Sequence, residues 1–141
     1  MENKWIEFLG KNVPSSKNSK MLTRKRIIKS KLCQEYEKWS EPLFEKNKEE
    51  WQRQLEEHKE RPIFVGFYFY RDSRRKWDFT NIVQLPADLM QKHNYLENDD
   101  TTNFVPVYMG EELSKKEKSG FKMKILKKKN INIFKLHIVF N

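Results

Sequence analysis

The sequence predicts a small α/β domain of the α+β kind, with a mixed β-sheet packed with helices. Aromatic and β-branched residues gather in short stretches typical of strands. Two other stretches repeat apolar residues at three- and four-residue steps, which is the period of a helix. Because 141 residues is near the usual size of one domain, residues 1–141 are expected to form a single domain.

The chain is predicted to begin with a strand and a basic loop. Residues 4–9, KWIEFL, alternate apolar and charged side chains as a strand does. Residues 9–33 then contain eight Lys or Arg and no Asp or Glu. Within them, Pro, Ser and Asn in VPSSKNSK (13–20) favour a loop over a helix.

The first predicted helix begins near Ser30. Its apolar positions follow the helical period: Leu32, Tyr36, Trp39 and Leu43. Pro42 is expected to kink or restart this helix, with Ser40 as a new N-cap. Residues 41–60 are rich in Glu, Lys, Gln and Arg, which favours a solvated helix or arm without an assigned function.

The next two predicted elements are the most strongly patterned. The stretch PIFVGFYFYRD (62–72) is apolar without a break, which favours a central strand. A helix is predicted over residues 80–93, with a distortion at Pro86. The apolar residues of this helix share one face: Ile82, Leu85, Leu89 and Met90.

The remaining chain is predicted to alternate strands with polar loops. Residues 103–108 are predicted to form a short strand, and Pro106 indicates that it is an edge strand or an irregular one. Residues 110–120 are polar and are expected to form a loop. Residues 121–126 alternate cleanly as a strand, and 131–140 are predicted to form a last strand.

Charge and cysteine content indicate the class of binding partner and the cellular compartment of the protein. A net charge of +9 favours a polyanionic partner, with nucleic acid first. No apolar run is long enough to span a bilayer, so no membrane partner is expected. The start, MENKWIEFLG, lacks the apolar stretch of a secretion signal, and Cys33 is the only cysteine. A cytoplasmic protein is therefore expected.

Residues 76–100 gather acids in an otherwise basic chain. Asp78, Asn81 and Asp88 are spaced to form one polar stripe on a helix, and the following loop can return Asp99 or Asp100 beside them. Crowded carboxylates need a cation or a proton between them, and Mg²⁺ prefers such oxygen ligands. The acids therefore either hold a metal that activates water for phosphodiester hydrolysis or simply cap helices and form turns.

Two motifs in this order resemble the RusA-like Holliday-junction resolvase family. The first is Asp-x-x-Asn (78–81) at a strand-to-helix junction, followed by a helix and an Asp-Asp turn (99–100). The second is VPSSKNSK (13–20), which is similar to the family's early Pro-x-x-Lys-Asn loop. The order of the predicted elements also agrees, over roughly residues 5–126.

The resemblance implies a Mg²⁺-dependent endodeoxyribonuclease, with Mn²⁺ as a possible substitute. It would resolve Holliday junctions and other branched DNA by phosphodiester hydrolysis, as a homodimer encoded by a bacterium or phage. Two positions depart from the family pattern. Thr80 stands where the family usually has a second Asp, and Gln84 where a lysine is often found. The alternatives are a weak or inactive protein that binds branched DNA, and a structural protein whose acids are caps and turns.

The resemblance also implies roles for individual acids. Asp78 matches the first acid of the family motif, Asn81 its Asn, and Asp88 the acid in the middle of the helix. Asp100 matches the essential acid of the Asp-Asp turn, with Asp99 beside it. The expected metal ligands are Asp78, Asp88 and Asp100, with Asp99 as a supporting acid and Asn81 orienting them.

Basic residues flank both motifs and are expected to bind DNA phosphates, although charge runs are also common on solvated surfaces. Trp77, next to Asp78, is a candidate for stacking on an unpaired base. The candidate DNA-binding residues are Lys17, Lys20, Arg24, Lys25, Arg74, Arg75 and Lys76.

Overall fold

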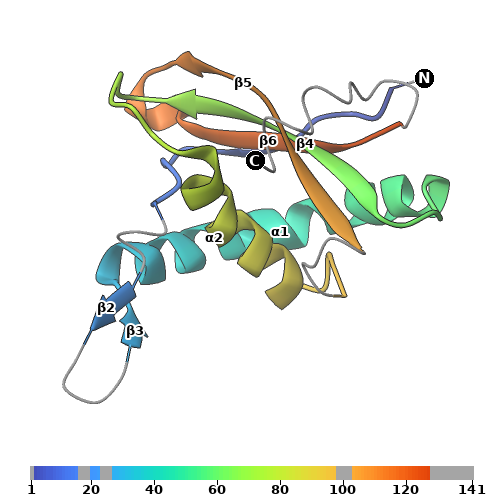
Figure 1. The fold of residues 1–141 in the computed structure, drawn as a ribbon, viewed down its shortest axis with the longest axis horizontal. Coiled ribbons are helices and arrows are strands. Elements are labelled where there is room, and N and C mark those ends of the chain that lie inside the picture. The colour runs from blue at the N-terminus through green and yellow to red at the C-terminus, as the bar shows by residue number, and fades with distance from the viewer. Residues whose placement is uncertain (1, 16–19, 23–26, 98–102, 128–141) are drawn as a thin grey trace.

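A mixed four-stranded sheet organises the chain (Figure 1). The computed structural model describes residues 2–15, 20–22, 27–97 and 103–127. The strand order is β1-β6-β4-β5, with β4 and β5 parallel and the other neighbours antiparallel. The strands are β1 (Ile6–Leu9), β4 (Ile63–Arg71), β5 (Phe104–Leu113) and β6 (Gly120–Leu126).

The central strand is β4, as its unbroken apolar sequence predicts. Its parallel pairing with β5 needs a crossover, which α2 (Phe79–Lys92) supplies. Asp78 caps the start of this helix, and its apolar face is buried as predicted. The strand β5 lies at the edge of the sheet, in agreement with the expectation from Pro106.

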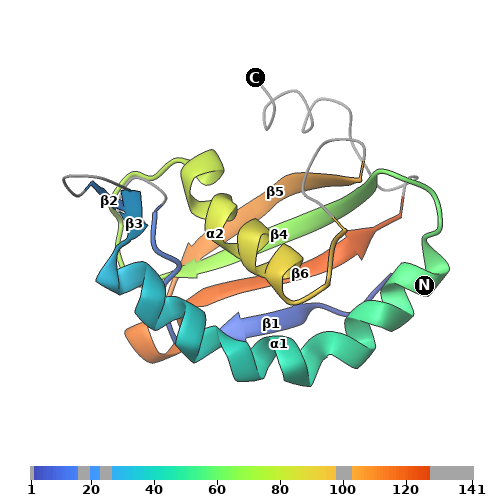
Figure 2. The same cartoon turned by 90° about the horizontal axis from the view of Figure 1, so that it is seen from below.

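Both long helices cover the same face of the sheet (Figure 2). The helix α1 (Lys31–Glu57) runs along β1 and β6, and α2 crosses β4 and β5. Between helices and sheet lies the main hydrophobic core, whose largest fully buried side chains include Trp51, Tyr36, Tyr95, Phe8, Phe44, Phe67, Phe69 and Phe121.

The restart predicted at Pro42 is wrong. The helix α1 runs through Pro42 without a break, and it begins at Ser30, whose Oγ accepts a hydrogen bond from the Cys33 N–H at 3.2 Å. Ser40 is buried within the helix, and its Oγ donates to the Glu37 carbonyl at 3.2 Å instead of capping a new helix. Pro42 removes one backbone donor, and burial of the helix face on both sides of it keeps the helix continuous.

Residues 41–60 do not form a solvated arm. Trp51 and Gln54 have 0% exposure, and both connect α1 to other parts of the chain. Trp51 Nε1 donates to the Tyr95 carbonyl at 2.9 Å. The high content of charged residues reflects the outer face of a helix whose inner face is core.

Two further strands differ from the prediction. Residues 110–113, expected in a loop, continue β5 because Gly110, Glu111, Glu112 and Leu113 pair with the second half of β4. The basic segment contains a short antiparallel hairpin of β2 (Lys20–Leu22) and β3 (Ile27–Lys29). The strand predicted over residues 131–140 lies outside the described residues.

Candidate functional site

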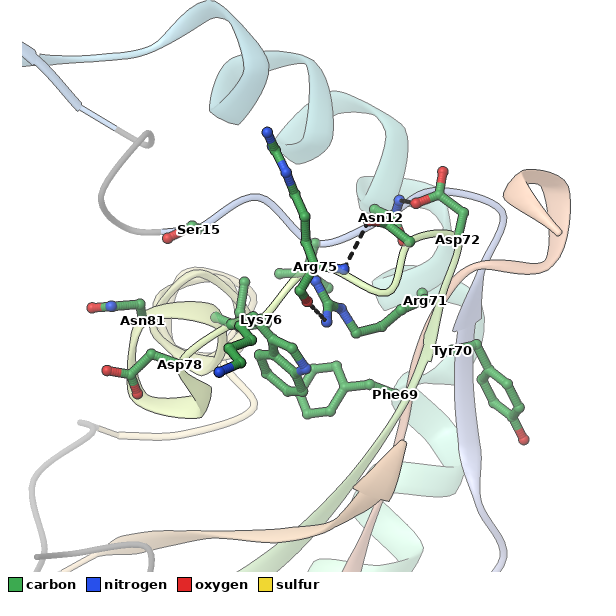
Figure 3. Close-up of a pocket in the computed structure, with 15 residues that line it drawn as sticks. Asn12, Ser15, Phe69, Tyr70, Arg71, Asp72, Arg75, Lys76, Asp78 and Asn81 are labelled. Atoms are coloured by element: carbon green, nitrogen blue, oxygen red, sulfur yellow. Dashed lines mark hydrogen bonds between the residues drawn. The ribbon is translucent and has the colours of Figure 1, made fainter. Parts of the chain in front are cut away.

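A polar cavity of about 410 Å³ lies at the C-terminal end of β4, where the chain turns into α2 (Figure 3). It is surrounded by the chain after β1, the end of β4 with the loop that leads to α2, the first turn of α2, and the first residue of β6. Its lining residues are Asn12, Val13, Ser15, Phe69, Tyr70, Arg71, Asp72, Ser73, Arg75, Lys76, Trp77, Asp78, Asn81, Ile82 and Gly120.

The cavity brings together the two segments that carry the family resemblance. Val13 and Ser15 belong to the early loop, and Asp78 and Asn81 belong to the start of α2. The amide of Asn12 donates a hydrogen bond to the Asp72 carboxylate, which ties the early loop to the end of β4. Segments about sixty residues apart in sequence therefore share one site.

Asp78 acts as a helix cap with one of its two carboxylate oxygens. Its Oδ1 accepts hydrogen bonds from the Thr80 N–H at 3.0 Å and from Thr80 Oγ1 at 2.8 Å. The interpretation of Asp78 as an N-cap is confirmed. Its Oδ2 accepts no hydrogen bond from the described residues, and the side chain is exposed. This oxygen is therefore a suitable ligand for a hard cation.

Asn81 and Asp88 lie at different distances from this carboxylate. Asn81 lines the cavity one turn after Asp78, and both side chains project from the same side of α2 (Figure 3). Asp88 is exposed and does not line the cavity. It follows Asp78 by ten residues, which is about 15 Å along a helix. Two carboxylates that far apart are beyond the reach of one shared ion, so Asp88 does not share an ion with Asp78 within the protomer.

Asp99 and Asp100 lie outside the described residues. The described residues on either side, Glu97 and Asn103, line a different cavity of about 480 Å³. That cavity is next to the start of β4, where the Asn103 carbonyl accepts a hydrogen bond from the Ile63 N–H at 2.9 Å. Asp78 follows the opposite end of β4. In the described part of the chain, no group of three or more Asp, Glu, His or Cys is placed to hold a metal.

The predicted basic residues are only partly described. Arg74, Arg75 and Lys76 are exposed, and the last two line the cavity. Three predicted DNA-binding residues of the basic segment, Lys17, Arg24 and Lys25, lie outside the described residues, and of Lys20 only the backbone, in β2, is described.

Trp77 lines the cavity, and its ring contacts neighbouring side chains. Its Nε1 donates to both carboxylate oxygens of Glu111, at 2.9 and 2.8 Å. The Arg71 guanidinium lies over its ring, 4.9 Å from the centroid. The ring also makes an edge contact with Phe69 at 4.8 Å. These contacts hold the ring in place, and its stacking on an unpaired base stays a prediction.

Sequence reasoning missed Arg71 and Glu111 at this site. Arg71 Nη1 lies 3.5 Å from Glu111 Oε2. Tyr108 Oη donates to Glu111 Oε1 at 2.9 Å, and burial together with this hydrogen bond raises the pKa of Tyr108 to about 12. Strand alternation places Arg71 on the same face of β4 as Phe69, so the sequence indicates the face that Arg71 occupies. The contact with Glu111 depends on the pairing of β4 with β5.

The fold and the cavity define a mixed α+β protein with a basic, polar site beside a helix N-terminus. No family model matches the sequence, and no curated protein matches it significantly. The described residues include no helix that is both long and apolar enough to cross a membrane.

Proposed function

We propose that this chain is a Mg²⁺-dependent endonuclease for branched DNA, of the RusA-like type. It would act as a homodimer in the cytoplasm and be encoded by a bacterium or a phage. The observation that carries the proposal is the meeting of the early loop and the Asp78–Asn81 segment at one cavity. The resemblance depends on both segments, and chain order alone does not require them to touch. Exposed Arg75 and Lys76 beside them supply cations for phosphate.

The residues around Asp78 fit a magnesium ion. Asp78 offers one carboxylate oxygen that is not used by the helix cap, and hard oxygen ligands with water and phosphate suit this ion. Asp100, supported by Asp99, is kept as the proposed second acid, although the residues on either side of it, Glu97 and Asn103, line the cavity at the other end of β4. Asn81 is proposed as an orienting group. When bound, the ion polarises the phosphoryl group and lowers the pKa of a bound water. The protein's part is to hold the phosphodiester in line through its basic loops.

A second candidate function is binding of branched DNA without cleavage. Thr80 favours it, because its hydroxyl takes the position of an acid in the family motif and donates to Asp78 instead of offering a carboxylate. A site with one ligand fewer binds the metal more weakly. A nicking assay with Mg²⁺ or Mn²⁺ separates the two functions, and Thr80→Asp is expected to increase nicking if the missing ligand limits the rate.

The decisive variant is Asp78→Asn. Asparagine is as good an N-cap as aspartate, so the variant removes the charge while it keeps the cap. We expect Mg²⁺-dependent cleavage of a synthetic four-way junction to fall at least a hundredfold, with junction binding in EDTA unchanged. Asp78→Ala should lose cleavage as well and also unfold about 1 kcal/mol more easily.

The matched control is Glu117→Gln, which removes an exposed acid from the turn at Lys116–Lys118, outside the cavity. It should cleave like the wild-type protein. Full cleavage by Asp78→Asn would remove Asp78 from the mechanism. A wild-type protein that binds the junction but never cuts it would support the second candidate.

A further inference from the structure

Arg71 is the least exposed cation that lines the cavity. It is the last residue of β4, and its side chain is 20% exposed, whereas Arg75 and Lys76 are exposed. Figure 3 shows Arg71 reaching back from the strand end toward the loop that leads into α2. There its Nη1 donates to the Arg75 carbonyl at 2.7 Å. The guanidinium thus has a fixed place at the wall of the cavity.

A network of three side chains holds this guanidinium. The Trp77 ring supports its flat face, and the Glu111 carboxylate faces Nη1 at 3.5 Å. Glu111 is itself fixed, because it accepts hydrogen bonds from Trp77 Nε1 and Tyr108 Oη. Restricting a guanidinium beforehand lowers the entropy cost of each hydrogen bond it later makes.

Two of the three nitrogens of this guanidinium have no partner among the described residues. The contacts to Arg75 and Glu111 both use Nη1, so Nε and Nη2 donate no hydrogen bond there. Together these two nitrogens form a planar edge that matches two oxygens of a phosphate. Arg74, Arg75 and Lys76 add positive charge nearby, against Asp72, Asp78 and Glu111.

We infer that Arg71 binds a phosphate group of the nucleic acid in this cavity, and that Trp77, Glu111 and Tyr108 are positioning residues for its guanidinium. The inference deepens the proposed function and rests on it, since it names the contact that anchors one phosphodiester beside Asp78. Phosphate contacts of this kind hold the strand in register without reading its sequence.

A purely structural role for Arg71 makes a different prediction. If Arg71 only ties the loop to the sheet, its loss lowers stability and leaves the salt dependence of DNA binding unchanged. If Arg71 contacts a phosphate, the variant releases one counterion fewer when it binds DNA. The slope of log Kobs against log salt then becomes less negative by about 0.9. The salt slope is therefore a readout that a structural role does not move.

The experiment measures binding of the full-length protein to a labelled four-way junction across a NaCl series, in EDTA so that no cleavage occurs. Arg71→Gln should bind about tenfold more weakly at moderate salt and lose close to one unit of salt slope. Arg71→Lys keeps the charge without the planar edge and should recover only part of the affinity. Thermal unfolding of each variant shows whether it is folded.

Glu111→Gln tests the positioning network against simple electrostatics. Removing a negative charge near DNA should strengthen binding if charge alone matters. If Glu111 positions Arg71, the same variant should bind three- to tenfold more weakly. The matched control is Glu112→Gln, the next acid on β5, which accepts from Tyr68 Oη at 3.1 Å and does not contact Arg71. It should bind as tightly as the wild-type protein or more tightly.

The two proposals fail in different ways. A folded Arg71→Gln with unchanged salt slope, or a Glu111→Gln that binds more tightly, overturns the role of Arg71 even if Asp78→Asn abolishes cleavage. If Arg71→Gln binds more weakly and the wild-type protein binds the junction without cutting it, the phosphate contact of Arg71 is supported. The second candidate function, binding without cleavage, is then supported as well. A wild-type protein that binds no junction overturns both proposals.

Discussion

Asp78 shows how one side chain serves structure and chemistry together. One carboxylate oxygen caps α2 through Thr80, and the other accepts no hydrogen bond from the described residues. Capping fixes the position of the carboxylate at the N-terminus of the helix. The structural interpretation of this acid and the functional one are therefore compatible, and only a variant such as Asp78→Asn that separates charge from capping distinguishes them.

His93 gives a pH prediction at the same scale. Its ring stacks on Phe44 with centroids 4.6 Å apart, and burial, followed by the charge of Lys92, lowers its pKa. Glu41 and Glu45 of α1 oppose this effect, and Lys48 adds to it. The pKa in the unfolded chain is about 6.5. Between this pH and the lower folded-state pKa, the unfolded state binds a proton that the folded state does not, so stability falls as the pH decreases through this window.

The measurement is a set of urea unfolding curves between about pH 7.5 and 5. His93→Gln should lose part of the decrease in stability that the wild-type protein shows below about pH 6.5. An NMR titration that gives His93 a pKa above 6.5 would reverse the sign and contradict the assignment.

At the scale of the element, α1 is joined to the sheet by one buried amide. Gln54 Nε2 donates to the Lys4 carbonyl at 2.9 Å, and its Oε1 accepts from the Ile125 N–H at 2.9 Å. Lys4 lies just before β1, and Ile125 lies near the end of β6, so both partners are on the sheet side of the core. A buried polar side chain thus replaces hydrogen bonds that the sheet does not supply at this position.

Gln54→Leu keeps the volume of the side chain and removes these bonds. The Ile125 N–H is then buried without a partner and the Lys4 carbonyl loses its bond to Gln54, which should cost roughly 1–3 kcal/mol in the free energy of unfolding. Gln52→Leu, exposed on the same helix, should change it by less than about 0.5 kcal/mol. Equal effects of the two variants in chemical denaturation would show that the amide contributes nothing.

At the scale of the whole molecule, the proposed homodimer matches the approximate two-fold symmetry of a four-way junction. A C2 dimer presents one site to each of two opposed strands. Sedimentation should therefore find a dimer that binds one junction, and wild-type protein should release linear duplexes by paired cuts.

Mixed dimers test this arrangement. A dimer with one wild-type and one Asp78→Asn protomer should make one cut per junction if each site uses its own Asp78. It should accumulate nicked junctions, which a denaturing gel of each labelled strand resolves. A monomeric protein that makes paired cuts, or a mixed dimer that resolves as fast as wild type, would contradict the two-fold arrangement.

Some features were predictable because they depend on neighbours along the chain. Alternation identified β1 and β6, an unbroken apolar run identified β4, and the helical period identified α2 and the start of α1. Asp78 was placed at a helix start for the same local reason. The continuity of α1 through Pro42 was not predictable, because burial of Trp51 and Gln54 outweighs the local cost of the proline.

The sequence by itself determined most of the strands and helices, the apolar face of α2, and that the chain is basic with four of its five Asp within residues 76–100. The tertiary structure alone decided that residues 12–15 meet Asp78, and that Glu111 meets Arg71 and Trp77. The physical reason is that periodicity specifies the face a side chain occupies but not its neighbour across the sheet. That neighbour is selected by the pairing and register of strands far apart in the chain.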